Sequence, residues 1–157
     1  MGENNKRDSN IIIIKDKSEV ILCILIKSNY SDEGIKFFTP NEFSQQLAYM
    51  KRPKGYKIKP HFHKKNERKV NFTQEVLIVK SGEVKVNLYD NKNIFFQSLI
   101  ITKGDVILLA SGGHSFEFIS ESELIEVKQG PYSDDDDKVI FSNFKRSCSH
   151  STGEFKI

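Results

Sequence analysis

From residue 11 onward the chain alternates between short apolar segments and short polar ones. The apolar segments are rich in β-branched and aromatic residues, and Gly, Asn, Asp, Ser or Lys separate them, which is typical of β-strands joined by turns. The pattern predicts strands at residues 11–14, 20–27, 35–38, 46–52, 56–63, 70–79, 83–89, 94–101, 105–109, 114–119 and 123–129.

The alternation is cleanest at residues 83–89. Val84, Val86 and Leu88 share one face of the predicted strand, which indicates a strand buried on one side only. The face expected to lie outside carries Glu83, Lys85, Asn87 and Tyr89. We therefore expect antiparallel sheets with one face in the core.

One short helix is predicted at residues 40–45. Thr39 is a suitable N-cap, Pro40 fits the first helical position, and Glu42 completes a capping box. With many strands, one helix and no internal repeat, the fold class is all-β. A closed or double-sheet β-barrel is the most economical arrangement because it leaves few strand edges unpaired.

Length and composition are those of one globular domain. The chain has 157 residues, of which 38% are hydrophobic and 29% charged, and this excludes fibrous and wholly disordered proteins. We expect a flexible N-terminal tail at 1–10, a single domain at 11–141 and a C-terminal tail at 142–157. The apolar runs at 11–14 and 20–26 are too short to span a membrane, so no membrane partner is expected.

The formal net charge is small, +3 from 24 Lys and Arg against 21 Asp and Glu. We expect this surplus to be spread over the chain, which does not suggest a nucleic-acid partner. The two cysteines, Cys23 and Cys148, lack a metal-binding spacing and fit a reducing compartment. Residues 1–10 do not resemble a secretory signal, so we expect a cytoplasmic protein.

Histidines and a glutamate stand where a metal site could form. His61 and His63 are two residues apart on a predicted strand, so both imidazoles leave the same face. Glu75 shares a face with apolar residues of the next strand, and His114 opens another strand. These four residues are the predicted ligands of a divalent transition metal, Fe, Mn, Ni, Co, Cu or Zn. The alternatives are a solvated histidine pair, a Glu75 paired with lysine and a His114 that caps a turn.

Two stretches resemble the motifs of the cupin superfamily. The segment from Gly55 through His61-Phe-His63, followed by Glu75 and by Gly82 seven residues later, is similar to the first cupin motif, and Gly104 to His114 is similar to the second. The resemblance implies a double-stranded β-helix, the jelly-roll barrel. The interval between His63 and Glu75 is longer than usual, so we expect a loop at 64–73 near the site, and Glu67 on it is a rival carboxylate ligand.

A narrower resemblance rests on the segment Glu126-Val-Lys-Gln-Gly-Pro-Tyr132, followed by an acidic run and Lys138. It is similar to the small WbuC-like cupin metalloproteins associated with bacterial surface-polysaccharide gene clusters. This implies a cytoplasmic, metal-containing barrel that acts on or senses a sugar or sugar nucleotide. Because a bound metal can polarise a sugar carbonyl, the first hypothesis is an isomerase or epimerase of surface-glycan assembly. The alternatives are a cupin that binds or senses a carbohydrate without turnover and an Fe(II)-dependent oxygenase.

Such chemistry needs a proton carrier and an anchor for the small-molecule substrate. The candidate proton carriers near the expected mouth of the barrel are Glu67, Glu126 and Tyr132. Arg68 is the candidate anion-binding residue, or else an exposed loop arginine. Lys128 shares a face with Glu126, and the two either line the pocket or form a solvated pair. Since cupins are commonly dimers, we expect a homodimer, with residues 11–14 and 20–26 at the interface or in the protein's own sheet.

Overall fold

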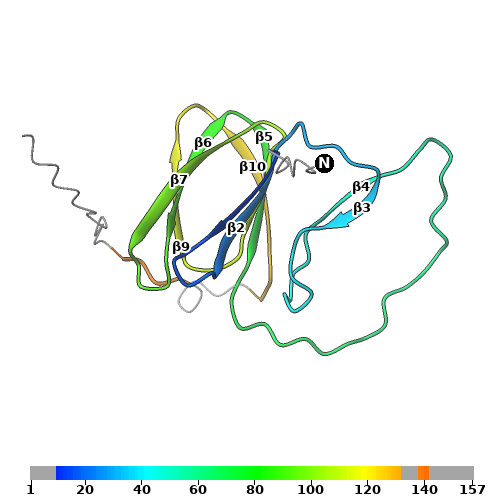
Figure 1. Cartoon of the computed structure of the whole chain (residues 1–157), viewed down its shortest axis with the longest axis horizontal. Coiled ribbons are helices and arrows are strands. Elements are labelled where there is room, and N and C mark those ends of the chain that lie inside the picture. Colours follow the sequence, from blue (N-terminus) through cyan, green and yellow to red (C-terminus); the bar gives the residue numbers. More distant parts are fainter. Residues whose placement is uncertain (1–9, 132–137, 142–157) are drawn as a thin grey trace, which may run out of the picture.

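The chain forms an all-β structure of antiparallel sheets in the computed structural model, which describes residues 10–131 and 138–141 (Figure 1). The strands are β1 Ile11–Lys15, β2 Ile21–Ile26, β3 Gly34–Phe37, β4 Ala48–Lys51, β5 Glu75–Ser81, β6 Glu83–Tyr89, β7 Phe95–Thr102, β8 Val106–Leu109, β9 Gly113–Phe118 and β10 Glu123–Lys128. Ten of the eleven predicted strands are therefore formed, with shifted ends.

Two sheets pack face to face. The larger has the strand order β1-β2-β8-β5-β10, and the smaller has the order β7-β6-β9. Val84, Val86 and Leu88 of the small sheet join Leu25 and Ile107 of the large sheet in one buried cluster, as alternation in β6 predicted. The two sheets are not hydrogen-bonded into a closed barrel among the described residues. The arrangement is a β-sandwich.

The outer face of the large sheet is covered by a third layer. The hairpin of β3 and β4, together with the turns between them, packs on this face, and a second apolar cluster there contains Ile24, Tyr30, Leu47 and Leu108. Strand β2 is therefore buried on both faces, which explains its unbroken apolar sequence ILCILI. It pairs with β1 and β8 inside its own sheet.

The helix predicted at 40–45 is wrong, because this segment forms turns in the structure. The Thr39 hydroxyl does not cap a helix. It donates to Gln46 Oε1 at 2.8 Å and accepts from the Leu47 backbone N at 3.2 Å, so it closes the loop between β3 and β4. A side chain with these two partners is withdrawn from the N-terminus that it was expected to cap.

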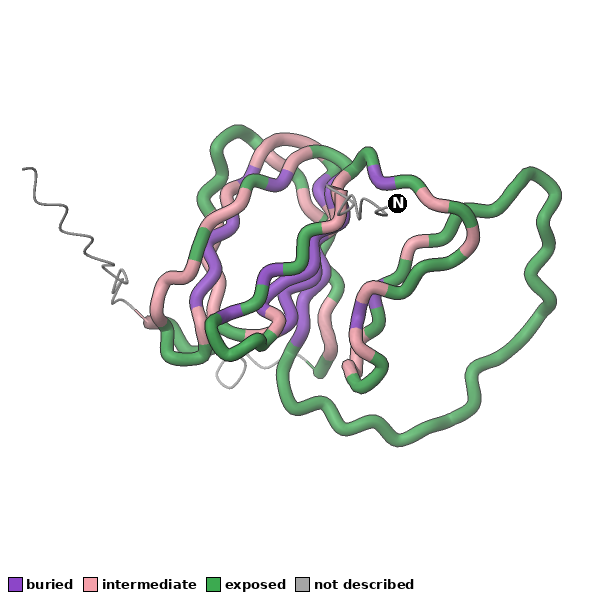
Figure 2. The backbone as a smooth tube through the Cα atoms, viewed as in Figure 1, coloured by how far each residue is buried: buried purple, intermediate pink, exposed green. Residues whose placement is uncertain are grey.

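The strand predicted at 56–63 is also wrong. Residues 52–73 leave the sandwich as a long exposed loop and return at the start of β5 (Figure 2). Tyr56, Ile58 and Phe62 are 54%, 56% and 85% exposed, so the alternating pattern has no sheet to pack against. Pro60 lacks an N–H and interrupts any ladder of hydrogen bonds at this place.

The predicted tails lie outside the described residues except for Asn10, whose carbonyl accepts a hydrogen bond from the Lys27 N–H. Within residues 10–131 and 138–141, no helix is long and apolar enough to cross a membrane.

Candidate functional site

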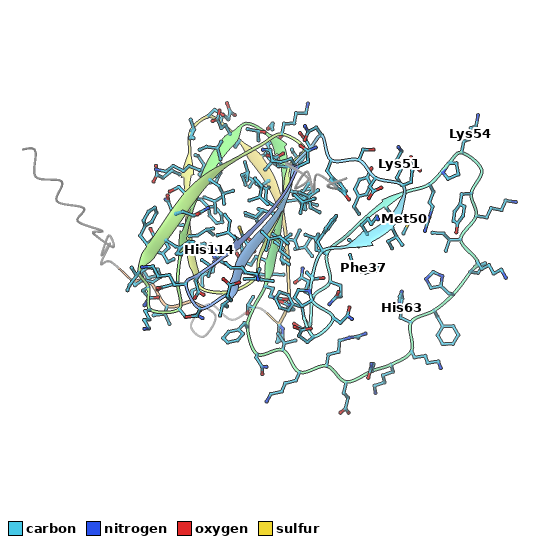
Figure 3. All side chains as sticks on the ribbon, viewed as in Figure 1. Phe37, Met50, Lys51, Lys54, His63 and His114 are labelled. Atoms are coloured by element: carbon cyan, nitrogen blue, oxygen red, sulfur yellow. The ribbon has the colours of Figure 1, made fainter. Side chains whose placement is uncertain are left out.

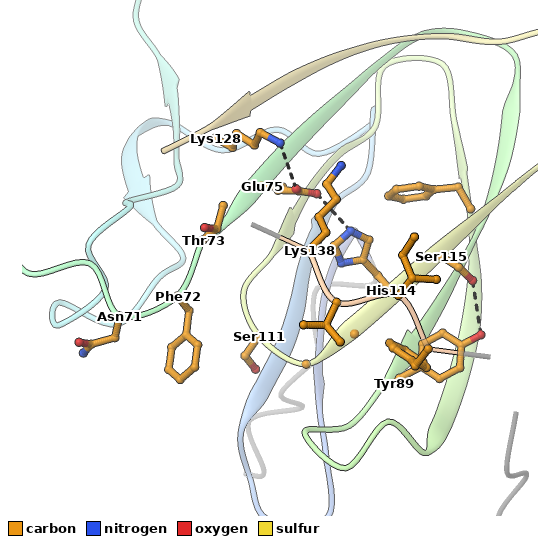
Figure 4. A pocket seen from close by; sticks show the side chains of 16 residues that line it. Asn71, Phe72, Thr73, Glu75, Tyr89, Ser111, His114, Ser115, Lys128 and Lys138 are labelled. Carbon is orange, nitrogen blue, oxygen red and sulfur yellow. Dashed lines mark hydrogen bonds and ion pairs between the residues drawn. The ribbon is translucent and has the colours of Figure 1, made fainter. Parts of the chain in front are cut away.

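A pocket of about 620 Å³ lies at one end of the sandwich, and we call it the His114 pocket (Figure 4). Its lining residues come from the ends of strands in both sheets, the end of the exposed loop and residues 138–141. They are Asn71, Phe72, Thr73, Glu75, Tyr89, Ser111, Gly112, Gly113, His114, Ser115, Phe116, Lys128, Lys138, Val139, Ile140 and Phe141.

Glu75 and His114 face each other across the sandwich. Glu75 begins β5 in the large sheet, and His114 stands in β9 of the small sheet. His114 Nε2 lies 3.1 Å from Glu75 Oε2, and the Glu75 side chain is only 10% exposed. The sheets thus bring an imidazole and a nearly buried carboxylate into hydrogen-bonding contact at the base of the pocket.

This contact makes Glu75 a stronger acid than an isolated glutamic acid. The hydrogen bond with His114 is the largest effect that lowers the pKa of the Glu75 carboxyl below its ordinary value of 4.5. Burial acts in the opposite direction, while the charges of His114, Lys128 and Lys138 add to the lowering. Glu75 is therefore ionised at neutral pH.

Two lysines approach the same carboxylate. Lys128 stands directly across from Glu75 in the pairing of β10 with β5, and its Nζ lies 3.9 Å from Glu75 Oε1. Lys138 follows the undescribed residues 132–137 and reaches toward Glu75 and His114 (Figure 4). The pocket therefore combines an imidazole, a carboxylate and two amines.

The opposite wall of the pocket is apolar and aromatic. Tyr89 is 1% exposed and makes edge contacts with Phe95 and Phe141, at centroid distances of 5.9 and 5.2 Å. The sequence placed Tyr89 on the same face as Asn87, and its hydroxyl lies 3.4 Å from Ser115 Oγ on that face, but the burial of the ring was not expected. Gly113 lies directly opposite Tyr89 in β9, so there is no side chain to hold the ring away from the strand. A glycine paired with an aromatic residue is the signal that alternation alone missed.

Gly112 fixes the backbone immediately before His114. It has a φ of +70°, and a Cβ at this position would lie 2.2 Å from the Tyr89 carbonyl oxygen. Only glycine fits such a conformation and such a close approach. The Gly112-Gly113 turn therefore determines how His114 enters the pocket.

The other predicted ligands lie elsewhere. His61 and His63 stand on the exposed loop, with ring centroids 5.4 Å apart, and Figure 3 shows His63 far from His114. Among the described residues, no group of three or more His, Cys, Asp or Glu side chains is placed to hold one metal ion. The structure thus unites two of the four predicted ligands, and in this arrangement the four do not share a centre.

The remaining predicted site residues divide in the same way. Lys128 lines the pocket, whereas Glu126 forms a 3.3 Å ion pair with Lys128 and is not part of the lining. Glu67 and Arg68 are exposed on the loop and do not line the pocket. Tyr132 lies outside the described residues.

The expected even spread of charge is wrong. Residues 52–69 contain eight Lys and Arg and one Glu, a local charge of +7 in a chain whose total is +3. All of these residues are exposed. The prediction that the protein has no nucleic-acid partner stays a prediction, and this basic loop is the place to test it.

No family model, curated protein or solved structure matches the chain.

Proposed function

We propose that the chain is an enzyme of the sugar isomerase or epimerase type, in which His114 transfers the proton and Glu75 orients it. One observation carries this proposal. A hydrogen-bonded imidazole and carboxylate lie at the base of a pocket of about 620 Å³, with two amines beside them. Such a combination is suited to moving a proton next to a carbonyl group.

His114 has the better position for the base. Its Nε2 faces the carboxylate, which favours the tautomer with the proton on Nε2 and leaves Nδ1 with a lone pair. Nδ1 removes a proton from the carbon next to the substrate carbonyl. The negative charge of Glu75 then stabilises the imidazolium that forms. Because its pKa is lowered, Glu75 itself is a weak base and serves as the orienting partner.

The lysines stabilise the other product of this step. When the proton leaves carbon, the electron pair moves to the carbonyl oxygen and forms an enediolate. Lys128 and Lys138 offer ammonium groups for that negative charge. Return of the proton from His114 to the neighbouring carbon, with transfer of the hydroxyl proton from the second oxygen to the first, gives the isomer. Delivery of a proton to the opposite face of the same carbon by a water or a lysine ammonium, with loss of the imidazolium proton to solvent, gives the epimer.

Hydrogen exchange tests the proposal directly. Purified protein is incubated in D₂O with a panel of aldoses, ketoses and nucleotide sugars that carry a ketone on the sugar ring, and deuterium incorporation next to the carbonyl is followed by NMR. We expect exchange with at least one sugar and a loss of about 10²-fold or more in His114→Asn, the size of a general-base contribution. Glu75→Gln reduces exchange by a smaller factor because the base remains.

Glu117→Gln is the matched control, because Glu117 is on the same strand as His114 but is paired with Lys85 on an exposed face. Its exchange rate should equal that of the wild type. Binding of a sugar without exchange would refute the enzyme and indicate a protein that binds or senses a carbohydrate. Exchange that persists in His114→Asn would refute the assigned role.

Metal binding by His61, His63, Glu75 and His114 is a second proposal. Its support is that the loop with the first two histidines ends in residues 71–73, which line the His114 pocket. Metal content of wild type, His61→Ala and Glu75→Ala tests it. Unchanged content in both variants would refute it and, with it, an Fe(II)-dependent oxygenase.

We also propose that the fold is the jelly-roll barrel of the cupins. Antiparallel sheets that present His114 and Glu75 toward each other support it. We also propose a cytoplasmic homodimer. The edge strand β10 exposes Ile125 and Val127, 47% and 51% accessible, which suits contact with a second copy. A monomeric elution profile at micromolar concentration would contradict the dimer.

A further inference from the structure

A second pocket of about 420 Å³ lies on the other face of the large sheet, and we call it the Gln74 pocket. Its lining comes from the β1–β2 turn, the turns before β4, the end of the exposed loop and the end of β8. The lining residues are Lys15, Glu19, Val20, Ile21, Pro40, Glu42, Phe43, Ser44, Lys69, Asn71, Phe72, Gln74, Ala110 and Ser111.

The two pockets adjoin each other. Asn71, Phe72 and Ser111 line both of them, and in Figure 4 these three residues lie at one side of the His114 pocket. Gln74 and Glu75 are neighbours in the chain, and each lines a different pocket. A ligand longer than a single sugar can therefore occupy both spaces, with its two ends on opposite sides of the start of β5.

Gln74 lines the second pocket and has an unused hydrogen-bond acceptor. The residue is 6% exposed, and its Nε2 donates to the Ala110 carbonyl at 3.3 Å. Its Oε1 is buried and has no hydrogen-bond partner. Buried polar atoms in folded proteins nearly always have a partner, so this oxygen is placed to accept a hydrogen bond from a ligand.

The surroundings of Gln74 suit a flat, partly polar ring. The Phe72 ring is 69% exposed and stands between the two pockets, and Phe43 packs at the wall of the second. Aromatic side chains stack on the faces of nucleobases. Each common base, when unpaired, also has an N–H group that can donate to an amide oxygen.

Cationic side chains occur in both pockets. Lys69 lines the Gln74 pocket, and Lys128 and Lys138 line the His114 pocket. A linker that joins a base in one pocket to a sugar in the other would lie between these amines. They favour binding of an anionic linker such as a diphosphate.

We propose that the Gln74 pocket binds the nucleoside of a nucleoside diphosphate keto sugar whose sugar lies in the His114 pocket. The inference rests on the proposed function for what happens to the sugar, but not for the binding of the nucleoside. Gln74 accepts a hydrogen bond from the base, and Phe72 packs against its ring.

Calorimetric titration of the full chain with UDP, dTDP, ADP, GDP and pyrophosphate tests the proposal. We expect at least one nucleoside diphosphate to bind ten-fold or more tightly than pyrophosphate. Phe72→Ala and Gln74→Leu should each weaken that binding about ten-fold and leave the affinity for pyrophosphate unchanged. Phe37→Ala is the control, because Phe37 is 59% exposed on β3 and lines neither pocket.

Phe72→Ala keeps the test valid if Gln74→Leu does not fold, since an exposed ring contributes little to folding. Equal affinity for pyrophosphate and all four nucleotides would overturn the inference, and so would nucleotide binding that Phe72→Ala leaves unchanged. Neither result would contradict hydrogen exchange on the sugar, so the proposed enzyme would stand without the nucleoside site. Tight nucleotide binding without any exchange, in contrast, would refute the proposed enzyme and support the nucleoside site.

Discussion

The contact between Glu75 and His114 can be measured as a coupling free energy. Glu75→Ala, His114→Ala and the double variant form a double-mutant cycle, in which each single change removes the contact without adding a new one. A hydrogen bond to a charged group contributes about 1.5–3 kcal/mol. The imidazole is 30% exposed, which places the expected coupling toward the lower end, at about 1–2 kcal/mol.

The assay is equilibrium unfolding in urea at pH 7, followed by far-UV circular dichroism because the chain contains no Trp. The matched control is a second cycle on Lys85 and Glu117, which are also 3.1 Å apart on neighbouring strands but more exposed. Solvent screens that pair, so its coupling should be smaller. A Glu75–His114 coupling no larger than that of the control would refute a strong, pocket-based contact.

The coupling must also depend on pH. The pKa of Glu75 is lower in the folded chain than its ordinary 4.5, so ionised Glu75 stabilises the fold above that pH. As the pH falls through the folded pKa, the carboxyl is protonated and this stabilisation disappears. The cycle repeated in small pH steps below 4.5 should give a coupling that falls as the pH falls and Glu75 is protonated. A coupling that grows steadily as the pH falls below 4.5 would contradict the assigned charge of Glu75.

Three further predictions concern the scaffold. Asp105→Asn should lower the unfolding free energy by about 2–4 kcal/mol, because the buried carboxylate pairs with Lys27. The pKa of Asp105 is lowered from 3.8 in the folded chain, so the ionised carboxylate stabilises the fold above that pH. Calorimetry should therefore show that the difference between the variant and the wild type shrinks as the pH falls below 3.8. Gly112→Ala should lower the urea midpoint of unfolding more than Gly55→Ala does. Both positions have a positive φ, which costs an alanine about 1–2 kcal/mol, but only at position 112 does the added Cβ also meet a backbone oxygen. Equal shifts in the two midpoints would contradict this. Burial raises the pKa of Cys23 to about 12, so in a variant without the other cysteine, iodoacetamide should modify the chain only after unfolding, as measured by mass spectrometry.

The strands could be predicted from the sequence because each carries its own local pattern. Residues 83–89 alternate over a full strand, and the unbroken apolar run of β2 matches its burial on both faces. The failures depend on partners that lie elsewhere in the chain. Residues 56–63 have strand-like composition but no neighbouring strand, and an isolated strand is not stable in water.

The same distinction explains the candidate site. Glu75 and His114 could be singled out because a carboxylate and an imidazole among apolar neighbours need polar partners. In the structure each is the polar partner of the other. Gln74 and Phe72 were missed. Their interest lies in a missing hydrogen-bond partner and an exposed ring at the junction of two pockets, and neither property can be read from residue type or spacing.

The position of both pockets follows from one feature of β5. Gln74 directly precedes β5 and Glu75 begins it, and the two side chains line different pockets at the place where the exposed loop ends, as alternation in an extended chain favours. Glu75 meets the small sheet and therefore His114, whereas Gln74 meets the layer formed by the turns before β4. Residues 71–73 lie at the entrance to both spaces, since Asn71 and Phe72 line each of them. A change in the loop conformation would consequently alter the two pockets together.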